Sequence, residues 1–298
     1  MPSTSGSRRW LGYALVTTLT WGLWGAFSDL PAKHGFPEAL TYVVWSATML
    51  LPAGFVLRRE GWKVPFDPCS IALGLAIGLS GAGGVIMLFP TLSIGPSYLI
   101  FPIISLAPAI TIAFSGAFLR ERMGRTGVLG IALALISLPL INDWKFGAAD
   151  VHLGLWFVLS LAITVLWGLQ NFFIKIAHST MDTGTIFFYM TLGGLLLDPV
   201  AVALTQWNVP INLGPDGPLL SAAVQLLNAV GSLTIAYALR EGKAIVVSPL
   251  TNAASPLITA LIAMAIAGEV PPLLKLAGIG LAVIASALLA LQTEEPHL

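Results

Sequence analysis

Long apolar stretches separated by short polar connections follow one another along the whole chain. A helix that crosses a bilayer needs about 20 mostly apolar residues. Stretches of about this length predict ten helices, at 10–30, 38–57, 70–91, 97–119, 126–142, 153–175, 183–206, 218–239, 244–267 and 273–292. The pattern therefore predicts an all-α integral membrane protein with ten transmembrane helices.

The second half of the chain repeats a pattern of the first half at a distance of 147 or 148 positions. The residues Gly95, Pro102, Pro108, Ile110, Thr111, Glu121 and Gly130 recur as Gly242, Pro249, Pro256, Ile258, Thr259, Glu269 and Gly278. Each copy closes a block of five predicted helices. Because five is odd, the second block enters the membrane in the opposite direction. We therefore predict two inverted five-helix repeats, over residues 1–147 and 148–298, which is a common plan of secondary transporters.

The composition agrees with a protein that lies almost entirely in the membrane. Of 298 residues, 56% are hydrophobic and only 9% are charged, whereas about a quarter of the residues in soluble domains are charged. Ten helices with short connections leave no room for a sizeable soluble domain. Cys69 is the single cysteine, so no internal disulfide can form. The lipid bilayer is thus the first expected partner.

Basic residues are distributed unevenly between the two predicted sides of the membrane. If the N-terminus is cytoplasmic, eleven lie inside: Arg8, Arg9, Arg58, Arg59, Lys63, Arg120, Arg122, Arg125, Lys175, Arg240 and Lys243. Only Lys33, Lys145 and Lys275 then lie outside. Because Lys and Arg favour cytoplasmic loops, we predict cytoplasmic N- and C-termini in a plasma membrane. The absence of an Asn-x-Ser/Thr sequon agrees with a bacterial inner membrane.

Four predicted helices carry polar or tryptophan side chains at steps of four, three and four residues. The sets are Thr17, Trp21, Trp24 and Ser28; Ser160, Thr164, Trp167 and Asn171; Ser221, Gln225, Asn228 and Ser232; and Ser248, Asn252, Ser255 and Thr259. At 3.6 residues per turn, each set occupies one face of its helix. The first two sets are 143 positions apart, which predicts that Trp24 and Trp167 occupy matching places.

These faces have two interpretations. Ser and Thr are common where membrane helices pack closely, so packing is favoured for them. For Asn and Gln, which are costly to place against lipid, packing and a substrate cavity both stay open. The predicted substrate contacts are Trp21, Trp24, Ser28, Trp167, Asn171, Gln225, Asn228 and Asn252. Gly74, Gly78 and Ala82, at four-residue steps, predict close helix packing.

Paired prolines predict points of bending. Pro102 and Pro108 fall within the fourth predicted helix, and Pro249 and Pro256 fall within the ninth. A proline inside a helix removes a backbone hydrogen bond and kinks the helix. We predict that these four prolines let the two helices act as alternate gates, and the alternative is that they only shape the bundle.

Ionisable residues are scarce within the predicted helices. Asp198 lies deepest, in the seventh helix near its outer end, and is the predicted site of a coupling proton or ion. The alternative is a residue at the edge of an outer loop. Glu121 and Glu269, at helix ends, are interpreted as structural.

Several other classes of protein lack support in the sequence. No His or carboxylate cluster has metal-ligand spacing, and no phosphate-binding loop for ATP is present. No basic surface with interleaved aromatic residues predicts nucleic-acid binding. We therefore predict no cofactor, no metal, no nucleic-acid partner and no enzymatic activity.

The repeated segments carry a resemblance to a known family. Leu119-Arg120-Glu121-Arg122 is followed nine residues after the glutamate by Gly130, and Glu269 precedes Gly278 by the same distance. Together with Trp21-Gly22-x-Trp24-Gly25, this pattern resembles the EamA-like part of the drug/metabolite transporter superfamily. The second copy departs from the first because no arginine flanks Glu269.

The resemblance spans nearly the whole chain and carries implications for fold and function. It implies a pseudo-symmetric ten-helix bundle with cytoplasmic termini and a central cavity formed by both halves. The family includes exporters of amino acids and other metabolites, and also sugar-uptake carriers. Its motifs identify the family well and the substrate poorly.

These observations predict a secondary transporter that moves a small metabolite by alternating access, most simply in export. The uncharged polar candidates favour an amino acid or a similar neutral or zwitterionic compound, since phosphate groups favour basic residues. The alternatives are a channel-like facilitator, a sugar-uptake carrier and, less favoured, a non-transporting membrane scaffold or enzyme.

Overall fold

The computed structural model describes residues 9–94, 100, 103–104, 106–121, 124–141, 154–267 and 272–290, and the regular structure in these ranges is helical throughout. The helices are α1 (Arg9–Phe27), α2 (Leu30–Lys33), α3 (Glu38–Arg59), α4 (Pro68–Ile94), α6 (Ala107–Phe118), α7 (Arg125–Ile141), α8 (Leu155–Ala177), α9 (Thr183–Leu196), α10 (Asp198–Leu204), the π-helical turn η1 (Pro215–Leu219), α11 (Leu220–Glu241), α12 (Ala244–Ala267) and α13 (Leu273–Ala290). Each predicted stretch contains one of these helices or two consecutive ones. The predicted all-α fold is confirmed for the described chain.

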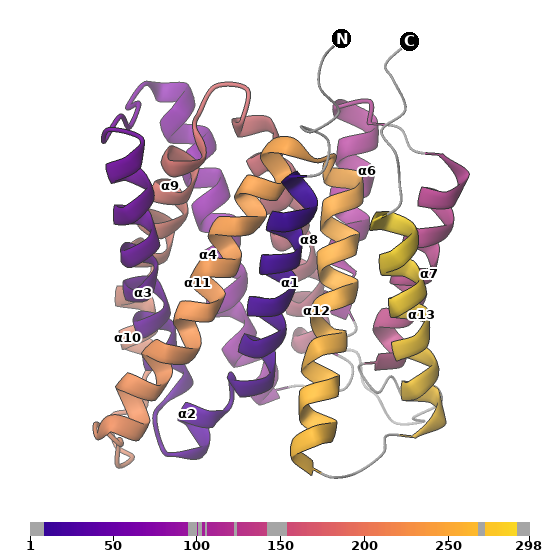
Figure 1. Cartoon of the computed structure of the whole chain (residues 1–298). Coiled ribbons are helices and arrows are strands. Elements are labelled where there is room, and N and C mark those ends of the chain that lie inside the picture. Colours follow the sequence, from indigo (N-terminus) through magenta and orange to yellow (C-terminus); the bar gives the residue numbers. More distant parts are fainter. Residues whose placement is uncertain are drawn as a thin grey trace.

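The length and composition of several helical segments suit a membrane. Five helical segments are long and apolar enough to cross one: Glu38–Arg59, Pro68–Leu88, Leu155–Ala177, Thr183–Leu204 and Pro215–Glu241. Shorter apolar helices cover Ala107–Phe118, Arg125–Ser137 and Leu276–Ala285. The helices stand side by side in one bundle (Figure 1), so the chain has the architecture of an integral membrane protein.

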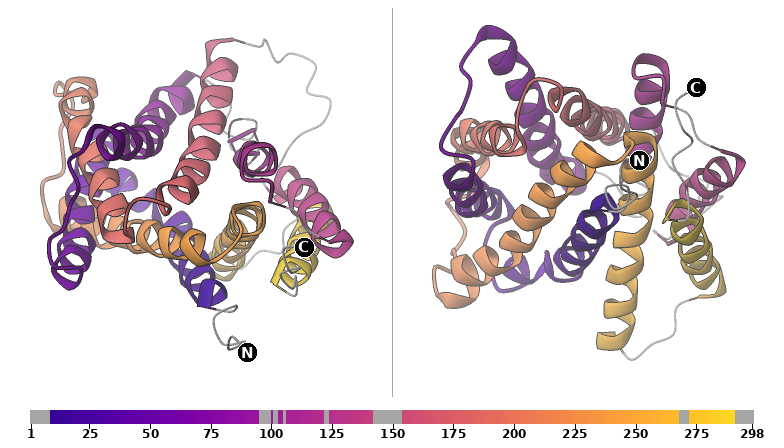
Figure 2. Two further views of the ribbon diagram at one scale, coloured as in Figure 1. Left: turned by 90° about the horizontal axis from the view of Figure 1, so that it is seen from above. Right: turned by 45° about the horizontal axis from the view of Figure 1, so that its top comes forward.

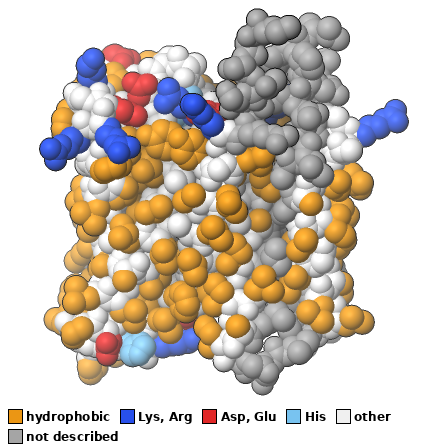
Figure 3. Space-filling model, viewed as in Figure 1, with side chains coloured by type: hydrophobic (Ala, Val, Ile, Leu, Met, Phe, Trp, Pro, Cys, Tyr) orange, Lys and Arg blue, Asp and Glu red, His pale blue; other side chains and the backbone are white. Residues whose placement is uncertain are grey.

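The surface has an apolar middle and a basic end. Figure 3 shows hydrophobic side chains over the middle of the visible face and Lys and Arg side chains gathered mainly near one end. Arg58 and Arg59 occupy the last turn of α3, and Arg240 occupies the last turn of α11. Both helices end at that side of the bundle (Figure 1). We call it the basic end, and the opposite side the far end.

The two halves of the chain exchange neighbours. Helix α1 packs against α11 and α12, whereas α8 packs against α4 and α6. The first long helix of each half therefore lies against helices of the other half, and Figure 2 shows α1 beside the two orange helices. Further contacts join α3 to α9 and α11, α4 to α9, α6 to α12, and α7 to α13. Because of these contacts the halves form one bundle.

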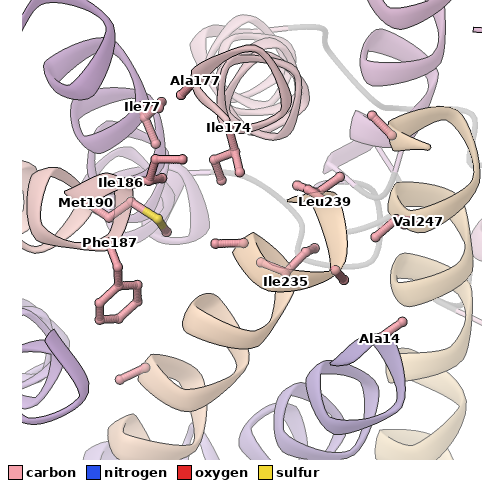
Figure 4. Close-up of a cluster of buried hydrophobic side chains, with 14 of the residues drawn as sticks. Ala14, Ile77, Ile174, Ala177, Ile186, Phe187, Met190, Ile235, Leu239 and Val247 are labelled. Carbon is pink, nitrogen blue, oxygen red and sulfur yellow. The ribbon is translucent and has the colours of Figure 1, made fainter. Parts of the chain in front are cut away.

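A tight apolar core fills the bundle close to its basic end. Ile174 and Leu239 directly precede Lys175 and Arg240, which lie in the last turns of α8 and α11. Ile186 of α9 and Val247 of α12 come from the first turns of their helices, and all four side chains are almost completely buried. Figure 4 shows Ile174, Ile186 and Ile77 close together, with Leu239 between this group and Val247. These four side chains pack closely together, as is usual in a protein core.

Glycines allow two of the helices to approach closely. A Cβ atom at Gly74 would collide with the ring of Tyr189, and one at Gly78 would collide with the Tyr189 carbonyl. Gly193 meets the backbone of Gly78 in the same way. The small residues of α4 therefore serve its packing against α9, which confirms the packing interpretation.

Candidate functional site

The predicted polar faces of α1 and α11 lie against each other. The indole Nε1 of Trp24 donates to Oε1 of Gln225 over 3.0 Å, and Nε1 of Trp21 donates to the carbonyl of Asn228 over 3.4 Å. One turn nearer the basic end, the hydroxyls of Thr17 and Thr234 lie 2.8 Å apart. Residue numbers rise on α1 as they fall on α11, so the helices run antiparallel and the two stripes form one continuous seam.

A third helix joins this seam through Trp45 of α3. Its Nε1 donates to Oδ1 of Asn228 over 2.8 Å, and the hydroxyl of Ser232 donates to the same oxygen over 3.3 Å. Trp45 is buried, and it is not among the substrate contacts predicted from the sequence. The signal was present, because the buried residues Thr41, Trp45, Thr48 and Pro52 have the same spacing of four, three and four.

Trp24, Trp45, Gln225 and Asn228 therefore form what we call the indole–amide cluster. Both amide oxygens accept an indole N–H. Within the described chain, no protein group accepts a hydrogen bond from Nε2 of Gln225 or Nδ2 of Asn228. The cluster offers two amide donors, one free lone pair on Oε1 of Gln225 and two aromatic rings, and it contains no charged side chain. Such a set suits a ligand with both donor and acceptor groups.

Trp21 in the first half occupies the place that matches Trp167 in the second half. Nε1 of Trp167 donates to the carbonyl of Gly81 over 3.2 Å, and Gly81 corresponds to Asn228 at a distance of 147 positions. The Trp167 indole lies against Gly84, just as the Trp21 indole lies against Gly231. The predicted pairing of Trp24 with Trp167 is therefore wrong by three residues, or about one turn. A four-three-four pattern looks nearly the same after such a shift.

Asn171 and Asn252 belong to a second polar group. Nδ2 of Asn171 donates to the hydroxyl of Ser248 over 3.2 Å, and that hydroxyl donates to Oγ1 of Thr111 over 3.3 Å. Thr111 donates to the carbonyl of Gly168 over 2.9 Å, while Asn252 bonds to the Ser248 carbonyl of its own helix. Asn171, Ser248 and Thr111 are buried. This group holds α8, α6 and α12 together and does not bond to the indole–amide cluster.

Ser28 also differs from the prediction in its bonding. Its hydroxyl donates to the Gly25 carbonyl of the same helix over 3.3 Å. The side chain is half-buried and lies one turn beyond Trp24, towards the far end of α1. It thus borders the cluster along the chain without a hydrogen bond to its members.

The prolines predicted as gates occupy different settings. Pro108 lies in the first turn of α6, which begins at Ala107, so this proline starts a helix and does not interrupt one. A first-turn proline is tolerated because its missing N–H would have no partner there. Pro249 is buried, and it and Pro256 lie within α12, which is assigned without a break from Ala244 to Ala267. Pro102 lies outside the described residues.

Asp198 lies at a break within a membrane-spanning segment. Helix α9 ends at Leu196 and α10 begins at Asp198, both within the apolar segment Thr183–Leu204. The Ser46 hydroxyl of α3 donates to Oδ1 of Asp198 over 2.8 Å. Since Ser46 follows Trp45 directly, α3 contacts both the acid and the indole–amide cluster.

Glu121 links the two halves near the basic end. Its two carboxylate oxygens accept hydrogen bonds from the backbone N–H groups of Ala244 and Ile245, over 3.1 and 2.9 Å. These groups open α12, so the carboxylate caps that helix and faces the positive end of its dipole. The structural interpretation of Glu121 is confirmed, and Glu269 lies outside the described residues.

One further acidic side chain, that of Glu60, bonds to the first turn of α9. Glu60 follows α3 and accepts a hydrogen bond from the N–H of Gly184 over 2.9 Å, and burial raises the pKa of its carboxyl. In the described part of the chain, no three His, Cys, Asp or Glu side chains come together as metal ligands.

Comparisons with known proteins agree with this architecture. A model of the EamA-like transporter family matches the chain twice, over residues 8–143 and 154–291. Twenty-eight chains of solved structures match. One crystal structure, titled only as that of a protein, has 17% sequence identity and a TM-score of 0.73, and the match covers 94% of this chain and 98% of that chain. At this identity the likeness concerns the fold alone. No curated protein matches.

Proposed function

Because the chain belongs to the EamA-like transporter family, we propose that it is a secondary transporter that exports a small neutral or zwitterionic metabolite, such as an amino acid, by alternating access. The family matches both halves of the chain, and the membrane-spanning segments suit a protein that moves a small molecule across the lipid bilayer.

The observation that carries the proposed substrate class is the indole–amide cluster. Trp24 and Trp45 come from the first half of the chain, and Gln225 and Asn228 come from the second half. The amide N–H groups suit a substrate carboxylate, the second lone pair of Gln225 Oε1 suits an ammonium group, and the indole rings suit an apolar or cationic part. A phosphate group would favour arginine or lysine, which the cluster does not contain.

Two observations support the proposed orientation of two inverted repeats, 1–147 and 148–298, in a bacterial inner membrane. Helix α1 begins and α13 ends at the basic end of the bundle (Figure 1). Arg58, Arg59 and Arg240 lie at that end, as the positive-inside rule expects of a cytoplasmic side. In the proposed topology all ten stretches cross the membrane and both termini are cytoplasmic.

Alternating access would use the seams between the halves. The apolar core near the basic end corresponds to a closed cytoplasmic side, while the indole–amide cluster lies farther from that end. We propose that the seam of Trp21 and the equivalent seam of Trp167 loosen in turn, and that Pro102, Pro108, Pro249 and Pro256 let their segments yield during the movement. Asn171, Asn252 and Ser28 then act as secondary contacts along the substrate's route.

Counterflow in liposomes tests this function. Liposomes containing the full-length protein are preloaded with unlabelled amino acids or sugars, and uptake of the labelled compound is followed. A carrier gives a transient overshoot of label. Trp45→Phe, which removes the N–H that holds Asn228, should weaken counterflow by about fivefold, the equivalent of one ordinary hydrogen bond.

A matched control keeps the test specific. Trp207 has an exposed indole that bonds to the Val202 carbonyl, so Trp207→Phe should leave counterflow unchanged. Equilibration without overshoot would favour a channel-like facilitator, and overshoot with sugars alone would favour a sugar carrier. Preferential transport of a sugar phosphate or a nucleotide would contradict the proposed substrate class.

A further inference from the structure

We propose that Asp198 carries the proton that drives transport, and that Ser46 transmits its protonation state along α3 to the indole–amide cluster. This inference rests on the proposed function, since it assigns the coupling ion and the coupling contact of the same transporter.

The first support is the position of the carboxylate. Asp198 is half-buried within the apolar segment Thr183–Leu204, where a charged side chain is costly. In the described part of the chain, the hydrogen-bond partner of the Asp198 side chain is the neutral hydroxyl of Ser46. The ion pair among the described residues joins Lys33 to Asp29 and does not include Asp198. An acid without a basic partner in an apolar layer lowers its cost by taking up a proton.

The groups that face Asp198 are acidic or neutral. Helix α10 packs against α3 and α9. From α3, Tyr42 and the first-turn residue Glu38 lie on the same side, whereas Arg58 and Arg59 are twelve or more residues from Ser46, or about 18 Å along the helix. From α9 the titratable group is Tyr189, whose hydroxyl donates to the Pro65 carbonyl. Neither neighbouring helix brings a cation to the carboxylate.

The local bonding favours a proton over a metal cation. Sodium and calcium ions are bound by several oxygen atoms that point lone pairs at the metal. The Ser46 hydroxyl lies 2.8 Å from Oδ1 of Asp198 and 2.8 Å from the Val43 carbonyl of its own helix, so among the described residues the carboxylate meets one hydroxyl and no array of oxygen ligands. The break between α9 and α10 exposes the Gly194 carbonyl, but this oxygen already accepts the Tyr42 hydroxyl over 3.0 Å and the Leu197 N–H over 3.1 Å. The carboxylate can therefore bind a proton without any rearrangement of ligands.

The contact with α3 supplies the link to the substrate. Ser46 bonds to Asp198, and its neighbour Trp45 bonds to Asn228 of the indole–amide cluster. When a proton enters from the outer side, the carboxyl group becomes neutral and its hydrogen bond with the Ser46 hydroxyl weakens by about half. Helix α3 is then freer to move relative to α10, and Trp45 moves with it. Release of the proton on the cytoplasmic side restores the bond.

Infrared difference spectroscopy tests the protonation step without any knowledge of the substrate. Full-length protein in lipid is titrated, and the carboxylic acid C=O band is followed in the parent and in Asp198→Asn. A titrating band that is absent from Asp198→Asn supports the inference. Ser46→Ala removes a donor to the charged form, so the titration should move upward by about one pH unit. Thr48→Ala removes a hydroxyl that bonds only to its own helix and should not move it.

Transport measurements test the coupling. Proteoliposomes with an imposed pH gradient should accumulate the compound that shows counterflow, and Asp198→Asn should abolish this gradient-driven accumulation. Gradient-driven accumulation equal to the parent in Asp198→Asn, or an infrared band unchanged by that substitution, would overturn the inference. If no compound of the panel shows counterflow with the parent protein, the proposed function fails, and the infrared titration still decides the role of Asp198.

Discussion

Trp21 and Trp167 make the same contact from opposite halves of the chain. Each indole Nε1 donates to a backbone carbonyl of the other half, that of Asn228 for Trp21 and that of Gly81 for Trp167. Each ring also lies against a glycine, Gly231 in one case and Gly84 in the other. Because the two seams are built alike, a movement that opens one has a structural equivalent that opens the other, as alternating access requires.

The glycines under the indoles should be intolerant of a side chain. A Cβ atom at Gly84 would collide with Nε1 of Trp167, whereas a Cβ atom at the adjacent Gly83 would lie 3.7 Å from Leu166, an ordinary contact. We expect Gly84→Ala to lower the free energy of unfolding by about 1–3 kcal/mol through overpacking. Gly83→Ala should be neutral or stabilising by about 0.5–1 kcal/mol, because alanine is the better helix former. Thermal unfolding in detergent measures both.

Equal stability of the two variants would contradict this account of the seam. It would mean that the Trp167 ring moves aside at little cost. Trp167→Phe combined with Gly84→Ala should recover part of the loss, because the smaller ring makes room for the methyl group.

The order and nature of the helices could be predicted from the sequence, because lipid imposes one long apolar stretch for each crossing. The 147-residue correspondence of Gly81 with Asn228 was also predictable and agrees with their equivalent contacts to Trp167 and Trp21. The alignment of α1 with its equivalent α8 in the second half could not be predicted, because polar faces repeat almost unchanged after one turn. The contacts of the two indoles with the carbonyls of Gly81 and Asn228 and with Gly84 and Gly231 distinguish the two alignments.

Only part of the site could be predicted from the sequence, for a similar reason. Gln225 and Asn228 were selected as costly polar groups, and both lie in the indole–amide cluster. Asn171 was selected on the same ground but bonds to Ser248 of α12, since a hydrogen bond between packed helices relieves the cost of a buried amide as well as a substrate does. Trp45 was missed although Thr41, Trp45, Thr48 and Pro52 have the four-three-four spacing, and its bond to Asn228 shows that it belongs to the cluster.

Loss of the Glu121 carboxylate should destabilise the contact between α12 and the first half. Two backbone N–H groups would lose their acceptor, so Glu121→Ala should lower the free energy of unfolding by about 1–2 kcal/mol. Glu121→Gln keeps one acceptor oxygen and should lose less. Asp182 precedes α9 without a side-chain cap bond, so Asp182→Ala is the matched control and should cost less than about 0.5 kcal/mol. A cost equal to that of the control would exclude capping by Glu121.

The backbone before Glu121 should also respond to substitution. Arg120 lies two residues after the end of α6 and has a φ of +54°, in the left-handed region, directly before Glu121, which bonds to α12. Because glycine adopts this conformation without strain, Arg120→Gly should keep or raise the unfolding temperature. Arg120→Val places a β-branched residue in the same conformation and should cost about 1–2 kcal/mol. If both variants unfold alike, the left-handed turn contributes nothing to stability.

The stability of the fold should fall in mild acid because of His178. Burial, together with the nearby cations Arg240 and Lys175, lowers the pKa of this imidazole to about 4. Its Nε2 lies 2.8 Å from the Ala236 carbonyl of α11, so the neutral ring binds α8 to α11. The unfolded chain takes up the proton near the ordinary pKa of about 6.5. Stability is therefore unaffected above that pH and decreases as the pH falls from about 6.5 to about 4.

The measured quantity is the difference in the free energy of unfolding between the parent and His178→Gln, followed over pH. The difference is needed because carboxylates also titrate towards the acidic end of this range. Glutamine can donate to the Ala236 carbonyl but does not titrate. The parent should lose up to roughly 3 kcal/mol relative to the variant between about pH 6.5 and about pH 4. His34→Gln provides the control, because His34 is exposed and should show the parent's pH dependence. If His178→Gln retains the full acid sensitivity of the parent, the buried imidazole is not its source.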